Sequence, residues 1–192
     1  MILADLDERD ILNGLRALLA EKGIANAAEI AGRIAATDAA NPGQGAAMVA
    51  RAWTDPGFRA LMLADGTKAA EAMGIPMRGL PPLGVLENVP GLHHLVVCTL
   101  CSCYPRAVLG YPPFWYKSAA YRAKAVRAPR ALLREFGTEL PADVAIRVVD
   151  STADYRWMVL PERPVGTEGW DAARLAAIVR EGDMIGVTIP SV

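Results

Sequence analysis

Residues 92–103 read LHHLVVCTLCSC, and this stretch ends in all three cysteines of the 192-residue chain. The apolar run over residues 92–97 predicts a strand that delivers Cys98 to a loop at its end. Functional residues often lie at such strand-to-loop junctions. Three cysteines packed into so short a segment indicate a metal site.

The segment from Cys101 to Cys103 can offer one ion a planar set of donors. These are the two cysteine sulfurs and the backbone amide nitrogens of Ser102 and Cys103, joined by small and nearly strain-free chelate rings. Cys98 can add its sulfur as an axial ligand and leave one position open. Thiolates and ionised amides form a strong ligand field, so we predict a low-spin trivalent cobalt or iron ion in preference to zinc.

Other interpretations of the cysteines stay open from the residues alone. Tetrahedral zinc needs a fourth side chain, and His93 and His94 are the only histidines of the chain. A disulfide between Cys98 and either later cysteine leaves one thiol over. Free cysteines also pack in cores as small hydrophobic side chains. A non-catalytic zinc-binding or redox-sensing module is therefore the alternative of a different class.

The sequence VCTLCSCYP at residues 97–105 resembles the metal-binding signature of nitrile hydratase alpha subunits, and Thr99 matches the cobalt branch of that family. The resemblance covers about residues 45–190. It implies the nitrile hydratase alpha-chain fold and the hydration of a nitrile to a carboxamide. It also implies a Co(III) centre, with Fe(III) as the alternative. Further matching segments are Val108–Gly110, Pro112–Pro113, Trp115–Ser118, Tyr121–Arg122, Arg127–Arg130, Glu135–Gly137, Asp150–Ser151, Arg156–Pro164, Gly166–Trp170 and Met184–Val187.

The family pattern, carried over to these residues, assigns the metal ligands. It makes Cys98 the axial thiolate, Cys101 the cysteine oxidised to a sulfinate and Cys103 the cysteine oxidised to a sulfenate. Ser102 and Cys103 supply the amide nitrogens. The resemblance therefore places Cys101, Ser102 and Cys103 in the catalytic set.

Further residues are expected around the centre. The Ser102 and Thr99 hydroxyls are expected to hold the oxidised sulfurs by hydrogen bonds, and Tyr104 and Trp115 are expected to line the substrate pocket. Arg106 stands where the family commonly has tryptophan, so it is expected to place a cation beside the anionic loop. This departure and the compact length resemble the nitrile hydratase branch that acts on toyocamycin, which implies a bulky heteroaromatic nucleoside nitrile. Thiocyanate hydrolase has a subunit with nearly the same cysteine loop, and it is the alternative function.

The resemblance also implies partners. They are a beta subunit or two smaller beta-like chains, a metallochaperone or activator that loads cobalt, and a small-molecule nitrile. The chain has 20 Lys+Arg against 21 Asp+Glu, a net charge of -1, which gives no drive toward nucleic acid or anionic membranes. The start of the chain lacks a basic region followed by an apolar stretch, so a cytoplasmic protein is expected.

The order of elements predicts an α+β protein, because helices come first and strands come later. We expect a helical arm over residues 1–44 and a metal-binding catalytic domain over residues 45–192, in which helices pack on a mixed β-sheet. Helices are expected at residues 5–22, 26–37, 45–53, 55–63, 68–73 and 171–180, and after Pro112–Pro113 and Pro129. Strands are expected at residues 85–87, 92–97, 144–149, 155–160 and 184–189.

Overall fold

The computed structural model describes residues 7–192, and the chain divides into two units, Met1–Ala39 and Ala40–Val192. The first unit holds helices α1 (Glu8–Glu21) and α2 (Ala27–Ala39). The Asp7 side chain caps α1 by accepting a hydrogen bond from the Arg9 backbone nitrogen. Residues 5 and 6 of the predicted first helix lie outside the described residues. No helix of the described part is long and apolar enough to cross a membrane.

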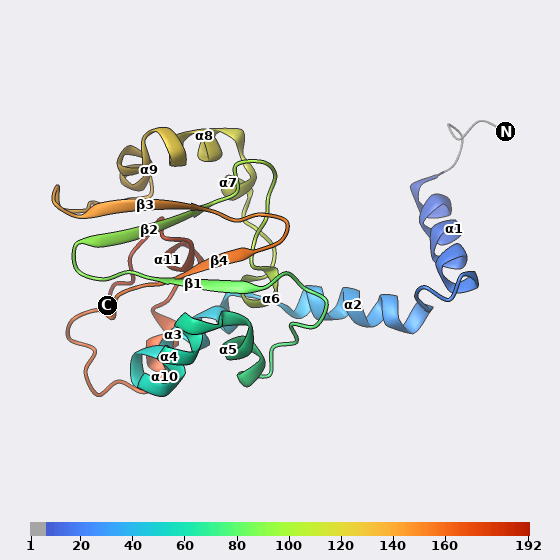
Figure 1. Cartoon of the computed structure of the whole chain (residues 1–192), viewed down its shortest axis with the longest axis horizontal. Coiled ribbons are helices and arrows are strands. Elements are labelled where there is room, and N and C mark those ends of the chain that lie inside the picture. The colour runs from blue at the N-terminus through green and yellow to red at the C-terminus, as the bar shows by residue number, and fades with distance from the viewer. Residues whose placement is uncertain (1–6) are drawn as a thin grey trace. The chain divides into compact units, whose positions relative to one another are not determined.

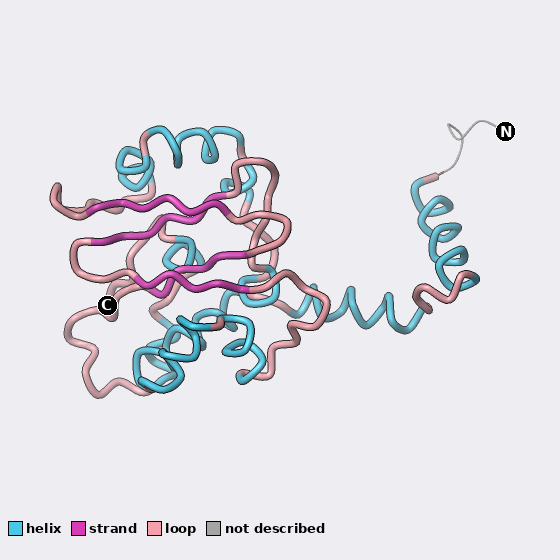
Figure 2. The backbone as a smooth tube through the Cα atoms, in the orientation of Figure 1, coloured by secondary structure: helices cyan, strands magenta, loops and turns pink. Residues whose placement is uncertain are grey.

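The second unit has the predicted α+β class, with strands flanked by helices (Figures 1 and 2). Its elements are α3 (Pro42–Thr54), α4 (Pro56–Ala64), α5 (Gly66–Ala72), β1 (Leu83–Glu87), β2 (Leu92–Val97), α6 (Arg106–Leu109), α7 (Phe114–Lys117), α8 (Ala119–Arg127), α9 (Pro129–Glu135), β3 (Ala145–Asp150), β4 (Arg156–Leu160), α10 (Ala172–Ala177) and α11 (Glu181–Ile185).

The strands form two parallel pairs, β1 with β4 and β2 with β3. The predicted mixed sheet is therefore wrong in detail, since the only antiparallel pairing within residues 7–192 is one bridge between Val89 and Leu92. Parallel strands need long crossovers, and helices α6 to α9 supply the one between β2 and β3. In Figure 1, α8 and α9 lie beside β2 and β3, whereas α3, α4 and α10 lie beside β1 and β4.

The C-terminal ends of β2 and β3 lie side by side because the two strands pair in parallel. Val97 is opposite Asp150 in the register, and the Ser151 backbone nitrogen donates to the Val97 oxygen at 2.7 Å. The loop after β2 holds the cysteines. The fold therefore brings that loop next to the residues that follow β3.

Residues 181–185 form a helix, so the strand predicted over residues 184–189 is wrong. The Asp183 carboxylate is fully buried and accepts hydrogen bonds from the Arg180 backbone nitrogen and the Thr188 hydroxyl. Gly186 ends α11 with φ +85°, and a Cβ there would lie 2.0 Å from the His94 backbone oxygen. Only glycine permits this conformation and this close approach to β2.

Other helices also differ from the sequence prediction, and the four-residue helix α6 was not predicted. Helix α3 begins at Pro42 rather than at residue 45, because Asn41 forms a capping box with Gln44. Helix α8 was not predicted, since only Tyr121 and Ala125 of its residues are buried and its apolar periodicity is weak.

Candidate metal centre

Three cysteine sulfurs converge directly after β2. Their Sγ atoms all lie within 4.8 Å of one another. The Cys101 sulfur lies 3.5 Å from that of Cys98 and 3.2 Å from that of Cys103, and no disulfide joins them. The Cys101 backbone nitrogen also donates to the Cys98 sulfur at 3.3 Å. The loop therefore folds back on itself, as the short spacing predicts.

The three thiols differ in exposure and in acidity. Cys98 and Cys103 are buried, and Cys101 is exposed. Hydrogen bonds from the Cys103 and Cys98 thiols lower the pKa of Cys101 to about 7. Burial raises the pKa of the Cys103 thiol to about 12, against a smaller opposing effect of the Arg156 charge. In the protein without metal, the Cys101 thiol thus ionises at a lower pH than the Cys103 thiol.

Asp150, at the end of β3, holds the first turn of the loop. Its carboxylate accepts hydrogen bonds from the Thr99 backbone nitrogen at 3.0 Å and from the Thr99 hydroxyl at 2.5 Å. Thr99 therefore directs its hydroxyl at Asp150, whereas the sequence predicted that it would hold an oxidised sulfur. On the other side, the Arg122 guanidinium donates to the Cys101 backbone oxygen at 2.7 Å.

Two buried tyrosines fix the end of the loop. The Tyr116 hydroxyl donates to the Cys103 backbone oxygen at 2.8 Å, and its ring packs edge-on against Tyr104 at 4.9 Å. The Tyr104 hydroxyl donates to the Glu181 carboxylate at 2.5 Å. Burial raises the pKa of both partners, and the bond to Glu181 raises that of Tyr104 further. Helices α7 and α11 therefore both hold the backbone around Cys103.

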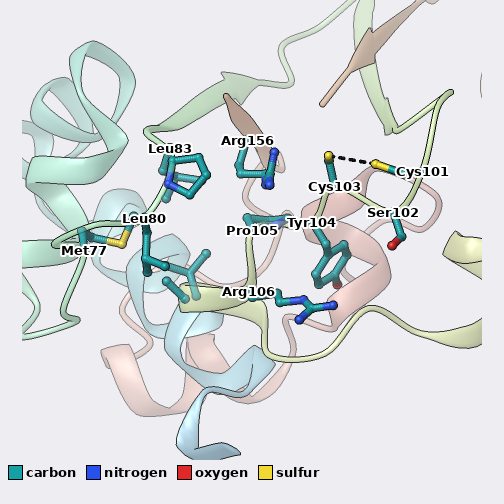
Figure 3. A pocket seen from close by; sticks show the side chains of 13 residues that line it. Met77, Leu80, Leu83, Cys101, Ser102, Cys103, Tyr104, Pro105, Arg106 and Arg156 are labelled. Atoms are coloured by element: carbon teal, nitrogen blue, oxygen red, sulfur yellow. Dashed lines mark hydrogen bonds between the residues drawn. The ribbon is translucent and has the colours of Figure 1, made fainter. Parts of the chain in front are cut away.

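A cavity of about 330 Å³ opens beside the cysteines (Figure 3). This volume is within the range of small-molecule sites, about 300–1,000 Å³. Cys101, Ser102, Cys103, Tyr104 and Arg106 lie on its wall, so five of the predicted residues share one cavity. The rest of the lining is apolar apart from Arg156 and consists of Met77, Leu80, Pro81, Leu83, Pro105, Ala107 and Val108.

The two arginines that line this cavity differ in how far they are buried. Arg106 is exposed, and its guanidinium carbon lies 5.4 Å from the centre of the Tyr111 ring. Arg156 is partly buried, and in Figure 3 its guanidinium is turned toward the cysteine side of the cavity. Sequence reasoning missed Arg156 because β4 lies far along the chain. The available signal was an arginine at the start of a strand within a segment that matches the family.

Trp115 lies outside the lining of this cavity. Its ring packs against Tyr121 at 5.0 Å and against Phe136 at 4.9 Å, so it belongs to an aromatic cluster that supports α7, α8 and α9. The Arg130 guanidinium is also used structurally, since it donates to the Leu140, Pro141 and Val144 backbone oxygens.

The histidines belong to a separate hydrogen-bond network. Asn88 contacts the His93 ring at 3.1 Å, and the other ring nitrogen of His93 lies 2.7 Å from the Gly186 oxygen. The Asn88 side chain also accepts from the His94 backbone nitrogen at 2.8 Å. Within residues 7–192, the group of candidate metal ligands around the loop consists of the three cysteines alone. A tetrahedral zinc site has no fourth side chain here.

The donor set fits a transition metal. Three sulfurs already face one another, and the Ser102 and Cys103 backbone amides lie between two of them. Soft thiolates in this number select transition metals rather than magnesium or calcium. The exposed Cys101 and the adjoining cavity give small molecules access to the site.

A cysteine cluster of this kind, at a strand end in an α+β domain, defines a metal-binding protein with a cavity beside the metal site. Comparison with known proteins narrows that class. The family profile described as nitrile hydratase, alpha chain, matches residues 7–188. The chain therefore belongs to the nitrile hydratase alpha-chain family.

Curated relatives agree with this assignment. The chain is 51% identical to the low-molecular-weight cobalt-containing nitrile hydratase subunit alpha of Rhodococcus rhodochrous, over 78% of this chain and 72% of that one. It is 45% identical to the cobalt-containing subunit alpha of Pseudonocardia thermophila, over 92% and 87% of the two chains. It is also 47% identical to thiocyanate hydrolase subunit gamma of Thiobacillus thioparus, over 76% and 64%.

Solved structures show the same fold. A recombinant thiocyanate hydrolase with partially modified cobalt centres superposes with a TM-score of 0.85 at 42% identity, covering 97% of this chain and 92% of that one. A double mutant of the iron-type nitrile hydratase from Comamonas testosteroni Ni1 gives 0.81 at 39% identity, covering 96% and 92%. The fold is thus common to cobalt and iron enzymes and to both activities.

Proposed function

We propose that this chain is the metal-bearing alpha subunit of a cobalt-type nitrile hydratase, which adds water to a nitrile and yields the carboxamide. The observation that carries the proposal is the convergence of three cysteine sulfurs on the wall of a cavity that is large enough for a small molecule. The cobalt-containing relatives support the choice of metal.

Cys98, Cys101 and Cys103 would hold Co(III) together with the backbone amides of Ser102 and Cys103, and Fe(III) is the alternative. When bound, such an ion supplies Lewis acidity toward a nitrile nitrogen or a water molecule. Cys101, Ser102 and Cys103 form the catalytic set of the proposal because all three line the cavity. Oxidation of Cys101 to a sulfinate and of Cys103 to a sulfenate is part of the same proposal.

The surrounding residues position these groups. The loop backbone is fixed on three sides by hydrogen bonds from the Tyr116 hydroxyl to the Cys103 oxygen, from the Arg122 guanidinium to the Cys101 oxygen and from the Thr99 backbone nitrogen to the Asp150 carboxylate. Rigid support of this kind keeps reactive groups in one geometry. Buried Tyr104 forms part of the cavity wall, and its hydroxyl is occupied by Glu181.

A beta subunit, or two smaller beta-like chains, is the proposed protein partner. Leu100, within the cysteine loop, is 88% exposed, and Phe114, at the start of α7, is 86% exposed. Contiguous apolar surface at a functional site marks a protein interface, and we propose that these two side chains belong to such a surface. We further propose that residues 1–44 form a helical arm and residues 45–192 a metal-binding catalytic domain, that an activator loads the cobalt, and that the complex is cytoplasmic.

The finer substrate proposal is a bulky heteroaromatic nitrile such as toyocamycin. The apolar part of the cavity wall, with Met77, Leu80 and Leu83, offers a flat ring system a surface to bury. Comparing kcat/KM for toyocamycin and for acetonitrile tests this point. A preference for acetonitrile would contradict the bulky substrate while leaving nitrile hydration intact.

Thiocyanate hydrolysis is the second candidate. Arg106 and Arg156 both line the cavity, and two cations favour an anionic substrate over a neutral nitrile. The relationship to thiocyanate hydrolase subunit gamma is consistent with this candidate.

One experiment separates the two. The chain is co-expressed with its partner in medium with cobalt, and the purified complex is given a nitrile or thiocyanate. Nitrile hydration predicts release of the carboxamide, whereas thiocyanate hydrolysis predicts release of carbonyl sulfide. A complex that contains zinc, or no metal, and releases neither product would contradict both and would favour a zinc-binding or redox-sensing module.

A further inference from the structure

Arg156 is partly buried and has one side-chain donor that no described residue satisfies. Its backbone nitrogen donates to the Pro82 oxygen at 2.9 Å, which places it at the start of β4. Its Nη1 atom is buried, and it is the one buried side-chain nitrogen or oxygen within residues 7–192 that has no hydrogen-bond partner. A buried donor without an acceptor costs about 1–3 kcal/mol, and a charged donor costs more. Such an atom therefore indicates an acceptor that these residues do not provide.

The surroundings of Arg156 identify the kind of acceptor. It lines the same cavity as Cys101, Ser102 and Cys103, and its guanidinium is turned toward the cysteines (Figure 3). Guanidinium groups prefer anionic acceptors, because charge-assisted hydrogen bonds are stronger than neutral ones. The neighbouring anionic groups of the proposed metal centre are the sulfurs.

The charge of that centre requires a counter-charge. Three thiolates and two ionised amides around a trivalent ion leave about two negative charges by formal counting, and burying them unpaired is costly. Arg106 was the cation expected here from the sequence. Its side chain is exposed and stacks on Tyr111, so it keeps most of its hydration. Arg156 is the better placed of the two lining cations.

We infer that Arg156 is a positioning residue of the metal centre: its guanidinium donates to the anionic sulfur group of Cys103, the thiolate sulfur or the oxygen of its sulfenate, and offsets part of the charge of the loaded loop. This inference rests on the proposed function, because it requires the metal. The proposed role of Arg156 differs from a purely structural role in the state of the protein that it stabilises. A structural arginine stabilises the chain with and without metal, whereas this arginine stabilises only the loaded state.

The test compares Arg156→Met and Arg156→Lys with the matched control Arg106→Met, which removes the other cavity cation. The cobalt-loaded complex of each variant is challenged with a chelator, and cobalt release is followed by elemental analysis and by the visible sulfur-to-cobalt absorption. Loss of a group that orients a metal ligand typically weakens metal binding by about 10–100-fold. We expect Arg156→Met to lose cobalt at least tenfold faster than wild type, Arg156→Lys to be intermediate, and Arg106→Met to match wild type.

Urea unfolding of the metal-free chain supplies the second readout. Removing a buried donor that has no partner is neutral or stabilising, so metal-free Arg156→Met is expected to unfold at the same urea concentration as wild type or at a higher one. The inference is overturned if Arg156→Met retains cobalt like wild type, or if its metal-free chain is destabilised as much as its loaded complex. A wild-type complex that never binds cobalt would instead overturn the proposed function, and with it this inference.

Discussion

Replacing Tyr116 by phenylalanine removes a single oxygen atom from the support of the cysteine loop. That hydroxyl donates to the Cys103 backbone oxygen at 2.8 Å, and Tyr116 is fully buried. The phenylalanine ring keeps the edge-on packing against Tyr104, so water does not replace the lost donor. A buried carbonyl left without its partner costs about 1–3 kcal/mol. We therefore predict that the free energy of unfolding of the full chain falls by about 2 kcal/mol.

The same change is predicted to loosen the metal, because the Cys103 amide is a proposed ligand. Tyr121→Phe is the matched control: its hydroxyl is also buried and donates to the Val96 backbone oxygen at 2.6 Å, within β2. Urea unfolding should show similar losses for both variants. Chelator-driven release of cobalt should be faster for Tyr116→Phe alone. Equal release from both variants would refute the link between this hydrogen bond and the metal site.

Three further predictions concern the supports of the site. Burial lowers the pKa of His93 below its usual 6.5, so the unfolded chain binds more protons than the folded chain at acidic pH. The free energy of unfolding should therefore fall as the pH drops below 6.5. In urea titrations, His93→Gln should show a shallower fall than wild type. Gly186→Ala should prevent soluble expression or cost more than about 4 kcal/mol, because its Cβ would lie 2.0 Å from the His94 oxygen; a soluble variant with wild-type thermal unfolding would contradict this. Asp150→Asn removes the charge from the acceptor of both Thr99 hydrogen bonds and should speed cobalt release by about threefold, whereas unchanged release from Asp150→Ala would rule this role out.

The sequence predicted the features that depend on local pattern. The apolar run before Cys98 became β2 over the same residues, and the short spacing of the cysteines brought their sulfurs together. Asp55 and Pro56 marked the start of α4 because capping and a first-turn proline are local signals. The cysteine cluster could likewise be predicted, because all three cysteines belong to the single short segment of residues 98–103.

Features that depend on tertiary contacts were missed. The run from Met184 to Ile189 is as apolar as a strand, yet the buried Asp183 and the left-handed Gly186 make its first part the end of a helix. A short apolar run of this kind is compatible with a buried strand and with a buried helix, so its periodicity alone does not tell the two apart.

Tertiary contacts also bring residues to the metal site that the sequence did not predict. Asp150 and Arg156 reach the cysteine loop because β3 and β4 pair in parallel with β2 and β1. Strand pairing of this kind depends on segments far apart in the chain. Arg106 drew attention through its proximity in sequence, whereas the structure gives the buried position to Arg156.

X-ray absorption at the metal edge of the co-expressed complex reports which atoms bind the metal. We predict one cobalt ion per chain, coordinated by the three sulfurs of Cys98, Cys101 and Cys103 and by amide nitrogens, and an intact mass that shows added oxygen atoms on the chain. A tetrahedral zinc ion, or a metal bound through a histidine ring instead of these sulfurs, would contradict it.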